Sequence, residues 1–231
     1  QPNGYVTFQG PGIASDPIGS DSATNYATWG TGRWNAMGMG TAPISSLTYT
    51  ATCVARNVTP LVILPTISVS QLTAGQTSQA QFTINIECDN AAVSGVSSNN
   101  TALGLQVPYE SYVAAQQLGL VSANGGVSYL LSSGYGTDSS VATGVGIALA
   151  NAGNGAPMNF VGWARCSAGQ CPQGNDAGWY PVLNGASGGG STAAGFTHYT
   201  TQLTATLARL PGQTVTAGKV DARAYVWVKV Q

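Results

Sequence analysis

The four cysteines are the residues of this chain whose spacing most clearly predicts chemistry. They fall as two pairs, Cys53 with Cys88 and Cys166 with Cys171, and an even count in a poorly charged chain rich in glycine and threonine indicates disulfides formed in an oxidising compartment. Zinc is the competing interpretation. The CSAGQC motif has four residues between its thiols, and neither a second such motif nor a nearby histidine accompanies it. We therefore expect two disulfides, no metal site and no cofactor.

Groups suited to catalysis are sparse in this sequence. His198 is the single histidine, and its alternation with Thr200, Gln202 and Thr204 indicates a strand face that points to solvent. The eight acidic residues are scattered, without the close carboxylate pair that glycosidases use, and no nucleophile-elbow motif is present. If the protein were a hydrolase, its activity would depend on His198. We expect that replacing His198 by alanine has no such effect. The sequence therefore predicts that the protein is not an enzyme.

Three aromatic residues flank the second cysteine pair and could bind a sugar. Trp163, Trp179 and Tyr180 lie close to asparagine and aspartate in the sequence, and an apolar ring with a polar rim suits a carbohydrate face. In the alternative interpretation these rings anchor the core or its loops, which is the commoner position of large aromatic side chains. We favour the second interpretation, and keep a glycan or protein receptor on a host as the alternative.

The composition limits the class of protein. Charged residues make up 6% of the chain, whereas ordinary soluble domains contain about a quarter. The seven lysines and arginines are spread singly, which argues against the phosphate-neutralising surface that nucleic-acid binding requires. We find no apolar run long enough to predict a membrane span. The start of the chain lacks the regions of a signal peptide, so we expect any such signal to have been removed already.

Short strands separated by turn residues dominate the sequence from about Ser46 onward. The stretch AQFTINIEC, for example, places Phe82, Ile84 and Ile86 on one strand face, and only residues 109 to 120 have a briefly helical pattern. Many short strands with turns between them predict an all-β sandwich. We expect this domain to span residues 46–231. Residues 1–45 form an amino-terminal segment in which the sequence predicts only a short alternating run near the start.

The last predicted strand shows the clearest alternation in the chain. From Val220 to Val230 every second residue is valine or alanine, and the residues between them are polar or aromatic. This period of two is typical of a half-buried strand. Such a strand must lie in a sheet, and something must pair with whichever of its edges is free.

Four motifs together resemble the fimbrial subunits of Gram-negative bacteria that are assembled by a periplasmic chaperone and an usher. The first is Cys53 followed by VARNVTPLVILPTISV and then Cys88, and the second is the penultimate strand HYTTQLTATLARL. The third is the ending QTVTAGKVDARAYVWVKVQ, and the fourth is YVTFQG near the start. The resemblance covers residues 46–231 well and extends more weakly to residues 1–13.

This resemblance implies an incomplete immunoglobulin-like (pilin-type) β-sandwich that lacks its seventh strand and is completed by donor-strand complementation. An apolar groove would lie open between the first and last strands. A chaperone strand would fill it first, and the extension of a neighbouring subunit would replace that strand in the fibre. Gln231 would carry the carboxylate that anchors the chaperone's basic residues. The implied groove and strand-exchange residues are Val58, Val62, Leu64, Leu203, Leu207, Val226, Val228, Val230 and Gln231.

The same resemblance implies a donor strand near the start of the chain. Its side chains would be Val6, Phe8, Gly10 and Ile13. The chain departs from the family pattern because residues 14–52 intervene before the first cysteine strand and because Pro11 removes a backbone donor. Three alternatives stay open: an ordinary first strand of the domain itself, residues 1–52 as the tail of a receptor-binding domain, and self-complementation by a segment that folds back.

The function predicted from these features is that of a fimbrial (pilus) subunit that assembles by strand exchange and mediates cell adhesion. The implied partners are a periplasmic chaperone, an outer-membrane usher and neighbouring fimbrial subunits, and the implied location is the extracellular fimbrium, reached through the periplasm. The length exceeds that of a minimal pilin, which favours a tip, adaptor or adhesin subunit over a shaft subunit. The alternative is a self-contained carbohydrate-binding β-sandwich, a lectin-like module.

Overall fold

The chain divides into two compact units, Gln1–Thr50 and Ala51–Gln231. The structure, a computed structural model, describes residues 4–7, 36–39, 51–97, 100–164, 173–190 and 193–230. In the first unit these are two short antiparallel strands, β1 (Gly4–Thr7) and β2 (Ala36–Met39), with Val6 opposite Met37. The second unit contains the other described elements.

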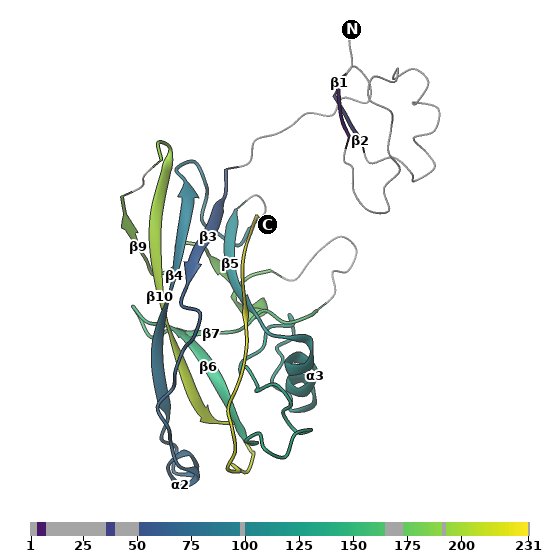
Figure 1. Ribbon diagram of the computed structural model, residues 1–231, viewed down its shortest axis with the longest axis vertical. Coiled ribbons are helices and arrows are strands. Elements are labelled where there is room, and N and C mark those ends of the chain that lie inside the picture. Colours follow the sequence, from purple (N-terminus) through teal and green to yellow (C-terminus); the bar gives the residue numbers. More distant parts are fainter. Residues whose placement is uncertain are drawn as a thin grey trace. The chain divides into compact units, whose positions relative to one another are not determined.

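The larger sheet of the second unit has the strand order β3, β4, β10, β6 and β7, and β9 also pairs with β10 (Figure 1). Its two long central strands are β4 and β10, which pair through most of their length. All pairings among these strands are antiparallel. The strands are β3 (Cys53–Val58), β4 (Ser78–Asp89), β6 (Val145–Asn151), β7 (Pro157–Met158), β9 (Ala186–Gly189) and β10 (Phe196–Arg209).

The second sheet has the order β11, β5 and β8, again antiparallel. These strands are β11 (Tyr225–Val230), β5 (Thr101–Gln106) and β8 (Trp179–Pro181). The helices of the second unit are short: α2 (Val69–Thr73), α3 (Tyr109–Gln117) and the 3-10 turn η2 (Asn175–Ala177). The predicted all-β class is therefore confirmed. None of the helices within the described residues has the length and apolar character needed to span a bilayer.

Local sequence signals account for both α-helices. Ser68 begins α2 with a capping box, in which its hydroxyl accepts from the backbone N–H of Gln71 and the Gln71 side chain accepts from the backbone N–H of Ser68. The helix predicted over residues 109–120 is confirmed in type, but α3 ends at Gln117. Gly119 takes a positive φ of 68°, a conformation that ends helices and favours glycine.

The core lies between the two sheets because each turns an apolar face toward the other. In β4 the predicted face of Phe82, Ile84 and Ile86 is buried, and Leu103 and Leu105 of β5 belong to the same apolar cluster. The alternation of β4 and β5 thus brings residues far apart in sequence into one core.

A disulfide joins Cys53 of β3 to Cys88 of β4, where the two residues are direct partners in the ladder. This pairing confirms the first of the two expected bridges. Both cysteines are buried, so the bond fixes the start of the edge strand β3 to the central part of its sheet. Cys166 and Cys171 lie outside the described residues, so the second bridge stays a prediction.

Gly178 provides a test of how tightly the chain just before β8 packs on the backbone at Phe160. It has a φ of 86°, and an added Cβ would lie 2.4 Å from the carbonyl carbon of Phe160. Gly75 is a matched control, because its φ is 85° and nothing lies within 4 Å of its Cβ position. In both variants an alanine must adopt a left-handed backbone conformation, which costs about 1–2 kcal/mol. Only in Gly178→Ala does the new Cβ also push against the backbone of Phe160. We expect Gly178→Ala to unfold about 1–3 kcal/mol more easily than Gly75→Ala in urea titrations.

Equal losses in the two variants would contradict this prediction. They would mean that the backbone at Phe160 moves aside at no cost, and that the packing beneath this residue is loose.

Candidate groove for an added strand

Strand β11 is an edge strand whose inner face is apolar. It pairs with β5 along one edge from Tyr225 to Val230, and within the described residues no strand pairs with its other edge. Val226 and Val228 are half-buried and pack on the core, whereas Tyr225 and Trp227 are 54% and 51% exposed. The predicted alternation is therefore present, and one row of backbone N–H and C=O groups has no partner strand.

The regular strand begins later than the predicted alternation from Val220. Strand β11 starts at Tyr225, opposite Gln106, which is the last residue of β5. Residues 220–224 belong to no strand, because β5 ends there, and the isolated bridge before them joins Lys219 to Val141. Ala222 and Ala224 nevertheless pack on the core in the predicted phase.

The segment that follows β3 forms a second extended wall without a ladder. Its backbone stays with β4 as far as Thr59, whose N–H donates to the carbonyl of Thr83 at 3.0 Å. From there to Ser68 the chain belongs to no helix or strand. Val62 and Leu64 pack on the core, whereas Leu61 and Ile63 are 71% and 76% exposed. One row of side chains is thus buried and the other exposed, as in a strand, although no ladder forms along this segment of the described chain.

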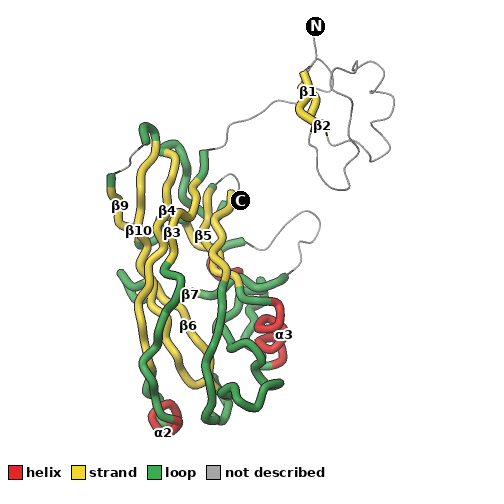
Figure 2. The backbone as a smooth tube through the Cα atoms, viewed as in Figure 1, coloured by secondary structure: helices red, strands yellow, loops and turns green. Residues whose placement is uncertain are grey.

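A groove of about 910 Å³ lies between these two walls. Residues 58–69 line it on one side and residues 216–218 and 220–226 on the other, and both segments can be followed as long extended traces in Figures 1 and 2. The described lining is apolar except for hydroxyl groups and the two charged residues Asp221 and Arg223. Such a site can take up an apolar side-chain row but offers little to a charged one.

The floor of the groove comes from strands and loops across the middle of the chain. Phe82 contributes from β4, Ile147 and Leu149 from β6, and Leu130 and Phe160 from loops. Sequence reasoning missed the residues of β6 and of the loops. The alternation in ATGVGIALA predicted a strand there, but no local signal showed that this strand would lie beneath the open edge.

The expected groove residues fall into three groups. Five of them line the groove, namely Val58, Val62, Leu64, Leu207 and Val226. Val228 packs on the core without being part of the groove lining, and the side chain of Val230 and all of Gln231 lie outside the described residues.

Leu203 requires a correction, because it is a core residue and not a groove residue. It is 0% exposed and pairs with Phe82 and Asn151 in the middle of the larger sheet. Leu203 and Leu207 share one face of β10, but β10 is long enough to extend from the closed core to the groove. The alternation of the sequence therefore predicted the correct face of β10 for Leu203, but not whether Leu203 lies in the part of the strand that reaches the groove.

The expected donor segment is described only in part. Val6 belongs to β1, whose backbone pairs with β2. Phe8, Gly10 and Ile13 lie outside the described residues, so their role stays a prediction.

The three aromatic residues considered for sugar binding do not form one exposed site. Trp179 and Tyr180 are buried, which agrees with the favoured interpretation that they anchor the core and removes them as possible glycan contacts. The ammonium of Lys229 lies 3.9 Å from the centre of the Trp179 ring, and burial lowers the pKa of Lys229. The Tyr180 hydroxyl donates to the carbonyl of Asn175 and accepts from the N–H of Asn159. Burial raises the pKa of this phenol.

Trp163 keeps an exposed ring but also has a structural role. Its Nε1 donates to the carbonyl oxygen of Val107 at 2.7 Å, and its ring packs edge-to-face on Tyr109 at 5.7 Å between centroids. The described residues contain no cluster of three or more side chains able to hold a metal ion.

Comparison with known proteins identifies the family. Residues 42–231 match the family model named Fimbrial, described as fimbrial protein. No curated protein matches. Among solved structures, the chain is similar to one from a study of a chaperone–usher pilus and its rod uncoiling, at 16% identity and a TM-score of 0.44, covering 84% of this chain and 96% of that chain. It is also similar to the P pilus rod subunit PapA, at 18% identity and a TM-score of 0.44, covering 79% of this chain and 100% of that chain. Because the family match extends over most of its length, the chain belongs to the fimbrial protein family.

Proposed function

We propose that this protein is a subunit of a chaperone–usher pilus, and that its groove accepts a β-strand from a partner. The observation that carries the proposal is the open apolar groove between the free edge of β11 and the extended segment 59–68. In this mechanism the partner strand supplies the missing seventh strand of the sandwich.

Backbone hydrogen bonding favours a strand over other ligands. An incoming strand can exchange N–H···O=C bonds with the free edge of β11, since every residue of that strand offers a donor and an acceptor. Segment 59–68 offers further backbone groups on the opposite wall. Pairing there removes the exposed edge, which otherwise promotes aggregation.

The apolar interior of the groove determines which side chains the partner strand must carry. Every second residue points into the groove, where Leu130, Ile147 and Phe160 form an apolar floor. Each large aliphatic side chain transferred there from water contributes about 1.5–3 kcal/mol. The partner strand must therefore alternate between apolar and polar residues.

The donor in the periplasm is a chaperone, and in the fibre it is the amino-terminal extension of a neighbouring subunit delivered by the usher. Val6, Phe8, Gly10 and Ile13 are this chain's own alternating candidates for that role. The protein then acts at the cell exterior as part of a pilus that supports adhesion, in a tip or adaptor position.

The test uses a fluorescent peptide that copies residues 3–15 and three variants of the full chain. Val226→Arg places a charge inside the groove, and Trp227→Arg is its matched control on the outer face of the same strand. Val62→Arg is a second inward variant, on the opposite wall. We expect saturable binding to wild type, a loss of at least about tenfold in affinity for the two inward variants, and little change for Trp227→Arg. Circular dichroism checks that each variant is folded.

Hydrogen exchange of the complex identifies where the peptide lies. Binding in the groove slows amide exchange in residues 59–68 and 222–230. Absence of binding to wild type, or equal binding to inward and outward variants, would contradict the proposed function.

A further inference from the structure

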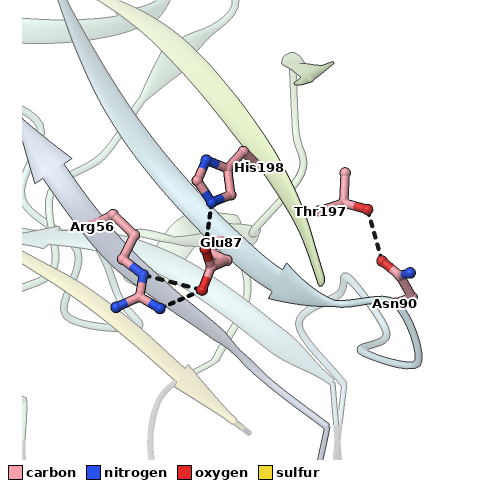
Figure 3. Close-up of polar contacts among 5 residues, drawn as sticks. All are labelled: Arg56, Glu87, Asn90, Thr197 and His198. Carbon is pink, nitrogen blue, oxygen red and sulfur yellow. Dashed lines mark hydrogen bonds and ion pairs between the residues drawn. The ribbon is translucent and has the colours of Figure 1, made fainter. Parts of the chain in front are cut away.

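A cluster of three side chains lies on the outer face of the larger sheet, away from the groove itself. Glu87 of β4 is at its centre and is contacted by Arg56 of β3 and His198 of β10 (Figure 3). Arg56 approaches the Oε1 atom of Glu87 through Nε at 3.2 Å and also through its terminal nitrogen. Nε2 of His198 contacts the other carboxylate oxygen. Glu87 therefore links three adjacent strands.

Arg56 reaches this position because of a bulge in β3. Ala55 is the partner of Ile86 and Asn57 is the partner of Asn85, so Arg56 is an extra residue in the ladder. A bulge of this kind redirects a side chain and bends the strand locally. The hydrogen bonds from Arg56 and then from His198 lower the pKa of Glu87.

The bulge lies just before the point at which the chain separates from β4 to form the groove wall. Besides their backbone ladder, β3 and β4 are joined by the disulfide of Cys53, by the contact of Arg56 with Glu87, and by the backbone bond from Thr59 to Thr83. Beyond Thr59 the chain is held by the side-chain packing of Val62 and Leu64 and by the hydroxyl of Ser78 in β4, which donates to the carbonyl of Pro65 at 2.6 Å. The direction in which the wall leaves the sheet is therefore set within a few residues of Arg56.

We propose that Arg56 and His198, acting through Glu87, are positioning residues that fix the bulge of β3 and thereby hold the groove wall ready for a partner strand. This inference rests on the proposed function and concerns its control. None of the three residues is part of the described groove lining, and the cluster acts through the bend that the bulge imposes on segment 59–68.

Few other charged side chains lie on the described strands around Glu87, so the effect of protonating this carboxylate can be followed by changing the pH. In the described strands packed around it, Asp89 is the further acidic side chain of β4, and β9 contributes only small uncharged residues. Tyr199 points to the core and Arg209 bonds to Gln213 at the far end of β10. Because the pKa of Glu87 is lowered from 4.5, its contribution is complete above that value and is lost as the pH falls through the lowered pKa.

The experiment compares Glu87→Gln and Arg56→Met with Arg56→Lys and with the control Gln81→Ala. Gln81 accepts a hydrogen bond from Gln202 on the same face, so the control breaks a link between β4 and β10 without involving β3. Two readouts are used on the full chain: affinity for the peptide of residues 3–15, and methyl NMR signals of Val62 and Leu64 in the free protein.

We expect Glu87→Gln and Arg56→Met to weaken peptide binding by about fivefold or more at pH 7, with Arg56→Lys intermediate and Gln81→Ala unchanged. The methyl signals of Val62 and Leu64 should shift in the first two variants. In wild type they should shift again on acidification, a step that Glu87→Gln lacks.

The outcomes separate this inference from the proposed function. Unchanged methyl signals and affinity in Glu87→Gln would overturn the positioning role. If wild type binds no peptide, the strand-acceptor function fails, and the methyl signals of the free protein still decide whether the cluster positions the wall.

Discussion

Replacing Cys53 and Cys88 together by serine is expected to lower the free energy of unfolding by about 3–4 kcal/mol. The bond closes a loop with a sequence separation of 35 residues, so its loss gives the unfolded chain considerable freedom. It also releases the start of β3, an edge strand with a ladder on one side only. Equilibrium unfolding in urea, followed by tryptophan fluorescence, measures the difference.

Reductant provides the control for this prediction. With reductant present, wild type and the double variant should have the same stability, and any further loss that reductant causes in the variant would report on Cys166 and Cys171. A difference below about 1 kcal/mol between wild type and variant would contradict the prediction, and would show that the β3 ladder and its ion pair hold the strand without the disulfide.

Leu203→Ala is expected to cost about 2–5 kcal/mol of unfolding free energy, because its side chain is fully buried between the two sheets. Leu61→Ala is the matched control, since Leu61 is 71% exposed on the groove wall. A surface truncation of this kind changes stability by no more than about 0.5 kcal/mol. Urea titrations of both variants, analysed with a common slope, give the two differences.

The same pair distinguishes a core role for Leu203 from a groove role. We expect folded Leu203→Ala protein to retain its affinity for the strand peptide, because Leu203 is absent from the groove lining. A small loss of stability combined with a large loss of peptide affinity would reverse the correction and return Leu203 to the groove.

The open groove is unfavourable for an isolated chain, and the rest of the fold must offset this. Leu61, Ile63, Tyr225 and Trp227 are exposed apolar side chains on its two walls, and β11 has an unpaired edge. Both features favour aggregation of an isolated chain. A protein built this way gains stability from its partner, so the strand that completes it is also expected to raise its melting temperature.

Local patterns in the sequence determined the strands and their faces. A period of two places one set of side chains on one face whatever the sheet around it, so Phe82, Ile84 and Ile86 and the half-buried valines of β11 could be predicted without a partner. The pairing of Cys53 with Cys88 followed from spacing and composition. The resemblance to the fimbrial family was likewise evident from four motifs along the chain.

Only the tertiary structure decided what lies beside each face. The groove floor combines β4 and β6 with Leu130 and Phe160 from loops, and the contacts among them span long stretches of chain. Burial of Trp179 and Tyr180, and the cluster of Arg56, Glu87 and His198, likewise depend on how strands pair. Alternation is set by the geometry of each residue and its neighbours, whereas strand order, register and the bulge at Arg56 are set by packing between distant segments. The chemistry of a single strand could therefore be predicted from the sequence, and the site formed between strands could not.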